Sequence, residues 1–580
     1  MHNLGTTLKT VWRIASPYFR SEDKWAGLAL LVIVIVIELG TVAIDVLLNK
    51  WRNRFYDALQ QHNWNNFVSE IIYFSVVVAI FVAIAVYQLY LNQWLQIRWR
   101  KWMTTRYLGE WLSDANHYRM QLEGDVADNP DQRLTEDIKM FVEQTLGIGL
   151  GLLNSVVTLG SFVVILWGLS AAAPLHAFGQ QYNIPGYLVW GALIYAIVGT
   201  VLTHLIGKPL IGLDFRQQQF EADFRFNLVR VRENSEQIAL LHGEPAERRH
   251  LLERFGLIVE NWIGIMNRTK KITAFTASYG QATQIIPYIL VAPAYFANKT
   301  QLGGMMQAAS AFLSVQGALS FFVSAYRLLA QWQSIVMRLD GFERSIAKAT
   351  ALREQSGIAR LSQPGTDIAF DDLLVRLPNG KPLVSADGFS LRNKAGTLVT
   401  GPSGSGKSTL FRAIAGIWPF GSGKIAIPAN ATLMMLPQRP YFPIGSLRAA
   451  IAYPAEAGAF DAEKIAAAVT AVGLPALTAR LDEEAHWNAM LSLGEQQRLG
   501  VARALLHQPD YLFLDEATAS LDEPSEAALY RLIAARLPAT TVISIGHRNT
   551  LEALHQDKAA LQPADDRFAI RSVKEPAGTA

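Results

Sequence analysis

The chain contains no cysteine among its 580 residues. This absence excludes a disulfide scaffold, a thiolate metal site and a cysteine nucleophile. An excess of charge of one sign is also missing, because 52 Lys and Arg residues face 49 Asp and Glu residues, for a formal net charge of +3. Because the charges nearly cancel and the basic residues form no stripe, the sequence gives no indication of nucleic-acid binding, and no nucleic-acid partner is expected. A chain of this length is too long to fold around one compact core, so we expect two domains of different character.

The N-terminal segment, residues 1–24, lacks the apolar core and small-residue cleavage site of a secretory signal peptide. A removed leader is therefore not expected. Leu8, Val11, Trp12 and Ala15 recur at helical spacing. This pattern predicts a short helix that lies at a membrane surface.

Long apolar runs are abundant between residues 25 and 330. Six stretches reach the roughly 20 residues that a helix needs to cross a bilayer. They are Trp25–Leu48, Ile71–Leu91, Leu146–Leu169, Tyr187–Ile206, Ile272–Phe296 and Met305–Ala330. The last two contain several amides and hydroxyls, which we expect to face protein or water rather than lipid. The sequence thus predicts a transmembrane domain of six helices over residues 25–340.

Positive charge is concentrated in two of the connections between these stretches. Residues 98–106 and 208–232 contain many Lys and Arg residues, whereas residues 171–184 contain none. The positive-inside rule then places the N-terminus and the C-terminal domain in the cytoplasm. The first outer connection departs from the rule with Lys50, Arg52 and Arg54, but Trp51 beside them indicates an interfacial helix. The long connections 97–145 and 207–271 are expected to be helical extensions of the spans.

Two carboxylates interrupt the first apolar stretch. Glu38 and Asp45 are seven residues apart and therefore share a helical face. Such groups can contact a substrate, attract a cation or handle protons. Equally, each can be hydrogen-bonded inside the bundle, or Asp45 can lie at the outer interface. The sequence leaves these alternatives open.

A glycine-rich loop, Gly401–Ser408, follows the short apolar strand Thr397–Thr400 and precedes a helix at Leu410–Ile417. This strand–loop–helix order is typical of a loop that binds the phosphates of a nucleotide at a helix N-terminus. Lys407 would reach the β- and γ-phosphates, and Ser408 would ligate Mg²⁺. The expected nucleotide-binding residues here are Gly401, Ser403, Gly404, Ser405, Gly406, Lys407, Ser408 and Thr409.

An acidic pair ends a second apolar strand, Tyr511–Leu514. Adjacent side chains on an extended chain point in different directions, which allows two roles. Asp515 would hold Mg²⁺, and Glu516 would polarise the attacking water as general base. We therefore expect hydrolysis of ATP, with Mg²⁺, in a domain over residues 367–565. A linker at 341–366 would precede this domain, and a tail at 566–580 would follow it.

Three further motifs resemble those of ATP-binding-cassette (ABC) ATPases. Leu491–Arg498 resembles the signature, with Leu493 where glycine is usual. This resemblance implies that Ser492, Gly494 and Glu495 complete the ATP site of the opposite subunit, so that the working unit is a homodimer. It also implies catalytic roles for Gln438, which would sense Mg²⁺ as a ligand, and for His547, which would contact the γ-phosphate. Near Leu377, where an aromatic usually stacks on adenine, no aromatic is found.

Residues 10–560 resemble the SbmA/BacA-like bacterial transporters that retain an ATPase (the BclA/YddA type). They also resemble the peroxisomal subfamily-D half-transporters and the mycobacterial cobalamin transporter. In the membrane half the resemblance rests on Asp128–Arg133, Arg232–Glu236 and Leu302–Gln307. It implies an exporter-type fold with six membrane-spanning α-helices and a C-terminal α/β P-loop ATPase domain.

The same resemblance implies a multi-pass protein among the lipids of the bacterial inner (plasma) membrane. Its function would be ATP-driven import of peptides, such as antimicrobial peptides and bleomycin, or of other hydrophilic solutes such as cobalamin. Two hypotheses compete with this one. The first is an exporter or flippase of lipids, acyl-CoA or drugs, and the second is a membrane regulatory ATPase that transports nothing.

Overall fold

The computed structural model describes residues 4–122, 129–172, 175–177, 180–182, 184–546 and 548–573. The chain divides into two compact units. The first comprises Met1–Leu108 and Asn129–Phe342, and the second comprises Gly109–Asp128 and Glu343–Ala580. A short segment from the N-terminal half of the sequence therefore belongs with the C-terminal unit.

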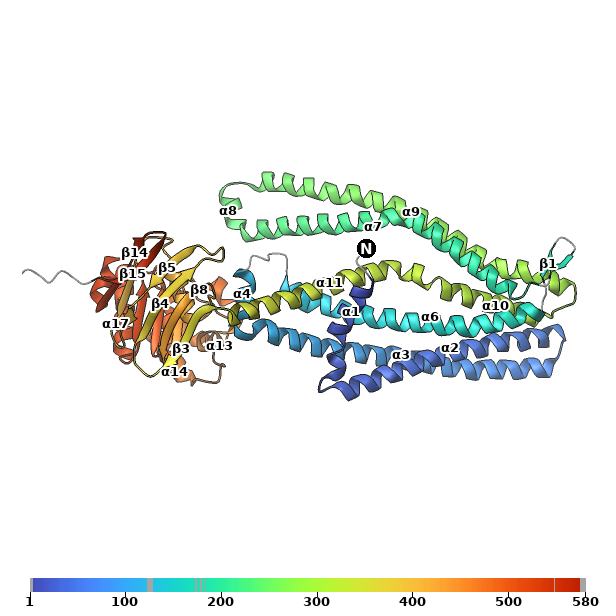
Figure 1. Ribbon diagram of the computed structural model, residues 1–580, viewed down its shortest axis with the longest axis horizontal. Helices are drawn as coiled ribbons and strands as arrows, with labels where there is room; N and C mark the ends of the chain where they lie inside the picture. Colours follow the sequence, from blue (N-terminus) through green and yellow to red (C-terminus); the bar gives the residue numbers. More distant parts are fainter. Residues whose placement is uncertain are drawn as a thin grey trace, which may run out of the picture. The chain divides into compact units, whose positions relative to one another are not determined.

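Long helices make up most of the first unit (Figure 1). They are α1 (Leu4–Ala15), α2 (Lys24–Gln60), α3 (Trp64–Leu112), α6 (Ile138–Ala172), α7 (Tyr187–Glu233), α9 (Glu244–Phe296), α10 (Leu302–Leu319) and α11 (Phe321–Glu354). The short elements are η1 (Tyr18–Arg20), α5 (Pro130–Gln132), the π-helical turn η3 (Arg133–Asp137), α8 (Ser235–Leu240) and a hairpin of β1 (Leu175–Ala177) and β2 (Gln180–Tyr182). The helix predicted at the N-terminus and the helical extensions of the spans are confirmed.

Four helical segments in the described residues are long and apolar enough to cross a membrane. They contain the first four predicted spans. The fifth predicted span lies within α9, and the sixth is divided between α10 and α11 at Ser320. The interfacial helix predicted around Trp51 is not a separate element, because α2 continues through it to Gln60.

The end of α2 caps the N-terminus of α10. The first amide groups of a helix have no partner within the helix. Here the Leu302 N–H donates to Gln60 Oε1 at 2.7 Å, and the Gly303 N–H donates to Asp57 Oδ1 at 2.8 Å. A Cβ atom on Gly303 would lie 2.0 Å from the backbone oxygen of Asn53. The close approach of α2 and α10 therefore requires glycine at residue 303.

Buried carboxylates tie other helices together. Asp137 is fully buried and accepts hydrogen bonds from Arg133 Nη1 at 2.8 Å and from Arg338 Nε at 2.9 Å. Two cationic partners offset the cost of removing this charge from water. The pair with Arg338 joins η3 to α11. Arg133 is the last residue of the Asp128–Arg133 motif that the sequence singled out. Asp128 lies outside the described residues.

Glu38 is also buried, and it lies in the first membrane span. It accepts hydrogen bonds from Asn154 Nδ2 at 2.8 Å and from Gln88 Nε2. It thus joins α2, α3 and α6. Asp45, on the same helix, is exposed in the single chain. Of the alternatives that the sequence leaves open, the structure shows hydrogen bonding inside the bundle for Glu38.

A mixed sheet of eleven strands forms the centre of the second unit. Across the sheet the order is β3 (Gly357–Gln363), β8 (Gly421–Pro428), β4 (Ile368–Arg376), β5 (Pro382–Ala386), β15 (Arg567–Ser572), β14 (Asp557–Ala564), β7 (Thr397–Thr400), β13 (Thr541–Ile545), β12 (Tyr511–Asp515) and β9 (Leu433–Leu436), and β6 (Ser390–Leu391) pairs with β4. The last four strands of this order, from β7 to β9, run parallel to one another. Parallel strands are usually buried on both faces, and β12 is buried over residues 511–514.

The helices of the second unit come between or after its strands in the chain, except α4, which precedes them all. They are α4 (Asn116–Leu122), α12 (Lys407–Ala415), α13 (Leu447–Ala452), α14 (Ala462–Ala471), α15 (Trp487–Met490), α16 (Leu493–His507) and α17 (Glu523–Arg536). The remaining elements are η2 (Ser113–Ala115), η4 (Pro475–Arg480), η5 (Asn549–Leu554) and the paired strands β10 (Gly445–Ser446) and β11 (Glu484–Ala485). The predicted combination of a helical membrane domain and a C-terminal α/β domain is confirmed.

Candidate active site

Four segments that the sequence singled out leave the carboxyl ends of neighbouring parallel strands. The glycine loop follows β7, Asp515 ends β12, Gln438 comes two residues after β9, and Gly546 follows β13. The register pairs Asp515 with Ile545 and Leu514 with Leu436, so these ends lie side by side. In open α/β sheets ligands bind at this edge.

The glycine loop has the backbone that a phosphate cradle requires. Gly404 and Gly406 have φ angles of 78° and 92°, a region that other residues rarely adopt. A Cβ atom on Gly406 would lie 2.5 Å from Val384 Cγ2. Within the described residues the buried hydroxyl of Ser405 has no hydrogen-bond partner. Ser403 is exposed and Thr409 is half-buried. The loop therefore fits a group rich in oxygen acceptors.

Lys407 and Ser408, the first residues of α12, connect the loop to the acidic pair. Lys407 Nζ donates to the carbonyl oxygens of Gly401 and Pro402 at 2.8 and 2.9 Å. Ser408 Oγ donates to Asp515 Oδ1 at 2.8 Å. Burial lowers the pKa of Lys407 and raises the pKa of Asp515, since each charged form loses water. A hydroxyl and a carboxylate thus meet beside a cation.

Glu516 has an unusual backbone conformation. Its φ angle of 51° lies in the left-handed region, which is uncommon for a residue other than glycine and is enriched at active sites. The Glu516 N–H donates to the carbonyl of Ile545 at 3.2 Å. Gln438 Nε2 donates a hydrogen bond to Glu516 Oε2 at 3.4 Å. The structure therefore brings Gln438 and Glu516 together at the carboxyl ends of the parallel strands, at the same sheet edge as the glycine loop.

The signature residues take part in a different set of contacts. Ser492 is the N-cap of α16 and forms a capping box with Glu495. A Cβ atom on Gly494 would lie 3.2 Å from Leu521 Cδ2. Within the described residues no hydrogen bond or ion pair joins Ser492, Gly494 or Glu495 to the glycine loop. The chain's own fold does not use these three residues to complete its own phosphate loop.

Gln497 connects three of the motifs, and it was not among the predicted site residues. It is buried on α16; its Nε2 donates to the Gln438 carbonyl at 2.9 Å, and its Oε1 accepts from the Ser520 N–H at 3.0 Å. Nearby, Arg548 donates to the carbonyl of Leu521 at 2.7 Å. The sequence signal was its place inside the signature stretch Leu491–Arg498. His547, predicted to be catalytic, lies outside the described residues.

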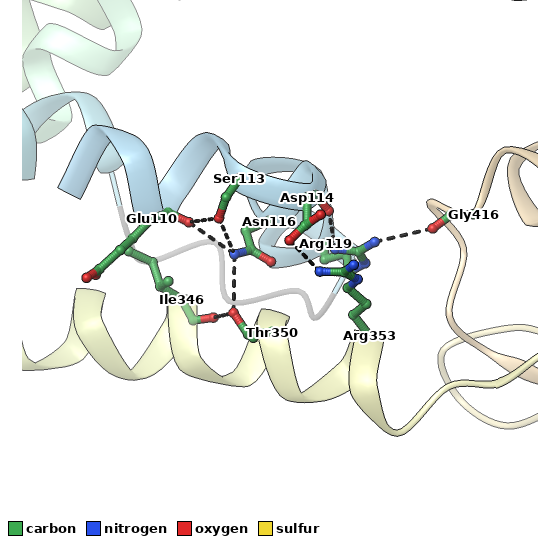
Figure 2. A network of polar contacts seen from close by, with 9 residues as sticks. All are labelled: Glu110, Ser113, Asp114, Asn116, Arg119, Ile346, Thr350, Arg353 and Gly416. Atoms are coloured by element: carbon green, nitrogen blue, oxygen red, sulfur yellow. Dashed lines mark hydrogen bonds and ion pairs between the residues drawn. The ribbon is translucent and has the colours of Figure 1, made fainter. Parts of the chain in front are cut away.

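The segment from Gly109 to Leu122 is the other feature that sequence reasoning missed. Figure 2 shows Arg119, on α4, reaching the carbonyl of Gly416, the residue that caps the C-terminus of α12. The Nη2–O distance is 3.2 Å, and Nη1 donates to the carbonyl of Asp114. Arg119 is buried, and burial lowers the pKa of its guanidinium. A buried cation therefore holds α4 to the end of the helix that begins at the phosphate loop.

Two further contacts in Figure 2 attach this segment to α11. Asn116 is buried, and its Nδ2 donates to Thr350 Oγ1 at 3.2 Å and to the Glu110 carbonyl at 3.0 Å. Arg353 forms an ion pair with Asp114. Leu122 packs against the core cluster that includes Phe411 and Phe513. Polar and apolar contacts thus both fix residues 109–122 within the C-terminal unit.

Comparisons with known proteins match both halves of the chain. The family described as ABC transporter transmembrane region 2 matches residues 14–296, and the family described as ABC transporter matches residues 385–519. The Escherichia coli inner membrane ABC transporter ATP-binding protein YddA is 33% identical over 92% of this chain and 94% of its own length. ABC transporter D family member 2, chloroplastic, of Arabidopsis thaliana is 32% identical over 98% of this chain and 88% of its own.

Two more distant matches are informative. The mouse lysosomal cobalamin transporter ABCD4 is 25% identical over 94% of this chain and 92% of its own length. Among solved structures, a bacterial Atm1-family ABC exporter with ATP bound has a TM-score of 0.71 and 17% identity, over 93% of this chain and 94% of that one. This likeness establishes the exporter-type fold. Together with the site geometry, the matches show that the chain belongs to the ABC transporter family, as a membrane half-transporter whose ATPase domain hydrolyses ATP to drive transport.

Proposed function

We propose that two copies of this chain form an importer in the bacterial inner membrane. It would use ATP to move peptides, or other hydrophilic solutes such as cobalamin, into the cell. The N-terminus and the ATPase domain would lie in the cytoplasm, because the connections 98–106 and 208–232 are rich in positive charge. The similarity to YddA, named an inner membrane protein, supports this location.

The observation that carries the ATPase part is the meeting of four functional groups at one sheet edge. Lys407 would hold the β- and γ-phosphates, in place of its present carbonyl partners. Ser408 and Asp515, 2.8 Å apart, would hold Mg²⁺ together with Gln438. When bound, that ion neutralises charge on the phosphate oxygens. Glu516 would accept a proton from the attacking water, and His547 would contact the γ-phosphate.

The homodimer is inferred from the position of the signature. Ser492, Gly494 and Glu495 have no hydrogen bond to the phosphate loop within the described chain, although by resemblance they contact ATP. A second copy can supply them, and symmetry then gives two equivalent sites. Each copy would complete the ATP site of the other.

The cargo proposal rests on polar groups in the fifth and sixth predicted spans. Gln281 and Gln284 are exposed on α9, and Gln307, Ser310 and Gln316 lie on α10. Gln307 Nε2 donates to Asn49 Oδ1 at 3.1 Å, and Gln316 Nε2 donates to the Tyr279 hydroxyl at 3.3 Å, so these two amides are satisfied inside the bundle. The exposed Gln281 and Gln284 would be costly against lipid and are suited to a water-filled pathway for hydrophilic cargo. The name of the mouse relative, a cobalamin transporter, supports the same class of cargo. The Atm1-family likeness keeps export as the competing direction.

Proteoliposomes with the ATPase domain facing outward would test this function. The lumen is loaded with a labelled peptide or with cobalamin, and ATP is added outside. Import corresponds to ATP-dependent release of cargo, whereas accumulation of cargo from outside would reverse the proposed direction.

Glu516→Gln tests the ATPase part of the proposal. We expect this variant to bind ATP but to lose hydrolysis by about 10²–10⁴-fold. Glu523→Gln, which changes an exposed carboxylate on α17, should keep both activities. Wild-type hydrolysis in Glu516→Gln would refute the assignment of the base.

A further inference from the structure

A basic pocket lies between α7 and α9, two helices that run side by side in the first unit (Figure 1). Its volume is about 410 Å³. From α7 it is lined by Pro209, Leu213 and Arg216, and from α9 by Gly264, Arg268 and Lys271, with Asn267 beside them. On each helix these residues recur every three or four positions, so they form two facing stripes. The pocket thus contains three cations and no carboxylate.

None of these three cations has an acidic partner among the residues that the structure describes. In the described part of the chain, no ion pair joins Arg216, Arg268 or Lys271 to a carboxylate, and the one hydrogen bond of Arg216 goes to a carbonyl of its own helix, at 3.4 Å. Some basic residues elsewhere in the same unit are paired, as in the Arg54–Glu70 ion pair at 2.8 Å. The second pocket of this unit contains Arg100 and Lys139, but Glu143 lines it as well. Other cations on these helices, such as Arg225 and Arg254, also form no ion pair in the described part of the chain, so the distinguishing feature of this pocket is that three cations line one cavity without a carboxylate.

The packing below the pocket makes it a formed site. Asn261, one turn from Gly264, is buried and donates to the Leu213 carbonyl at 3.0 Å and to Gln217 Oε1 at 2.9 Å. Gly264 leaves room, because a Cβ atom there would lie 3.2 Å from Leu213 Cδ2. Buried hydrogen bonds hold the two helices in register. The backbone positions of the three cations are therefore fixed relative to one another.

The surroundings of the pocket indicate the kind of anion. Lys271 directly precedes the fifth predicted span, and Pro209 follows the fourth, so the pocket lies at one edge of the membrane. Large apolar side chains on the membrane side of the pocket are exposed, including Leu205 (63%), one helical turn from Pro209 on the same face of α7, and Leu202 (40%). A soluble anion needs no apolar neighbours, whereas a phospholipid presents a phosphate and acyl chains together.

The geometry points to a binding site for the phosphate of an anionic phospholipid, such as phosphatidylglycerol, in the cytoplasmic leaflet. This assignment of the leaflet rests on the orientation proposed above. The phosphate lies among Arg216, Arg268 and Lys271, and the acyl chains lie along Leu205 and Leu202 on the membrane side of the pocket. Basic pockets between membrane helices on the cytoplasmic side are suited to such headgroups. Each cation near a membrane surface strengthens binding of an anionic lipid by about fivefold.

The test compares thermal unfolding of the full-length protein in detergent with added phosphatidylglycerol, phosphatidylcholine or glycerol phosphate. We expect stabilisation by phosphatidylglycerol alone, and a loss of apparent affinity of roughly 100-fold in Arg216→Gln/Arg268→Gln/Lys271→Gln. The matched control, Arg225→Gln/Arg249→Gln/Arg254→Gln, removes three cations from the same helices outside the pocket and should keep the effect. Lys271→Arg keeps the charge and should also keep it.

Three outcomes decide the proposal. Equal stabilisation of the pocket variant and the control variant by phosphatidylglycerol would overturn it. Stabilisation by glycerol phosphate without any effect of the lipid would keep the anion site but reject the lipid. If the triple variant does not fold, the single variants Arg216→Gln and Arg268→Gln must each weaken lipid binding about fivefold for the proposal to stand. Lipid binding should persist in Glu516→Gln, so failure of transport and failure of this site are distinguishable.

Discussion

Replacement of Arg119 by Met should release α4 from the C-terminal unit. Arg119 is buried, and its two terminal nitrogens donate to the carbonyls of Gly416 and Asp114. Met has a similar length and no donor, so the substitution leaves both carbonyls without this partner. The unit itself retains the sheet and the phosphate loop, since neither depends on this contact.

The magnitude follows from two opposing effects. A hydrogen bond from a charged donor contributes about 1.5–3 kcal/mol. The substitution loses two such bonds, but it also removes the cost of burying a guanidinium. Burial lowers the pKa of this guanidinium, and its Nε has no partner in the described residues. We expect a net cost of about 2–3 kcal/mol for keeping α4 in place. This corresponds to an increase of roughly 30- to 150-fold in the local opening equilibrium.

Hydrogen–deuterium exchange measured by mass spectrometry on the full-length protein can report this opening. Peptides covering residues 113–122 should lose protection in Arg119→Met, whereas peptides from β12 should not. Arg353→Gln provides the matched comparison, because it removes an ion pair with Asp114 in which both side chains are 52% exposed. Exposed pairs contribute at most about 1 kcal/mol, so exchange should rise by about fivefold or less. Unchanged protection in Arg119→Met, or equal effects of the two variants, would refute the reasoning.

Two further changes test the packing of each unit. Gly303→Ala should lower the thermal unfolding temperature by a few degrees, because its Cβ atom meets the backbone of Asn53 at a cost of about 1–3 kcal/mol. Gly317→Ala, on the same helix with open space around it, should leave that temperature unchanged. Similar unfolding temperatures for the two variants would contradict the close approach of α2 and α10. Burial lowers the pKa of His555 below its ordinary value of 6.5, and its Nε2 lies 2.8 Å from Ser544 Oγ. The unfolded chain therefore takes up the proton first as the pH falls, so stability should decrease from pH 6.5 downwards. His555→Gln should reduce the difference in unfolding temperature between pH 7.5 and 5.5, while His242→Gln, at an exposed turn, should leave it unchanged.

Much of the ATP site could be predicted because its residues follow local rules. A glycine loop between a strand and a helix, and an acidic pair at the end of an apolar strand, are recognisable within a few residues of each other. The parallel sheet then brings Ser408 and Asp515 together, although they are 107 positions apart in the sequence. Neither the contact between Gln438 and Glu516 nor the left-handed backbone of Glu516 could be predicted, since both depend on how separate loops meet.

The contacts of the membrane unit were less predictable for the same reason. Apolar length located the spans, but the capping of α10 by Asp57 depends on where α2 ends beyond its span. The sequence indicated only that Glu38 was unusual, and its two amide partners come from other helices. The segment at 109–122 gave no sign that it belongs with the ATPase domain. Its buried Arg119 resembles any surface cation until its partner, a backbone carbonyl, is known.

Helix α12 joins the two most informative parts of the C-terminal unit. Its N-terminus begins at Lys407, where the helix dipole favours phosphate, and its C-terminal carbonyls receive two cations. Arg119 donates to Gly416, and Arg360 donates to Ala415 at 3.2 Å. A helix of nine residues is only about 13 Å long and moves as a rigid body. A shift of the phosphate loop on nucleotide binding must therefore also shift the carbonyl that Arg119 holds, and with it the segment 109–122.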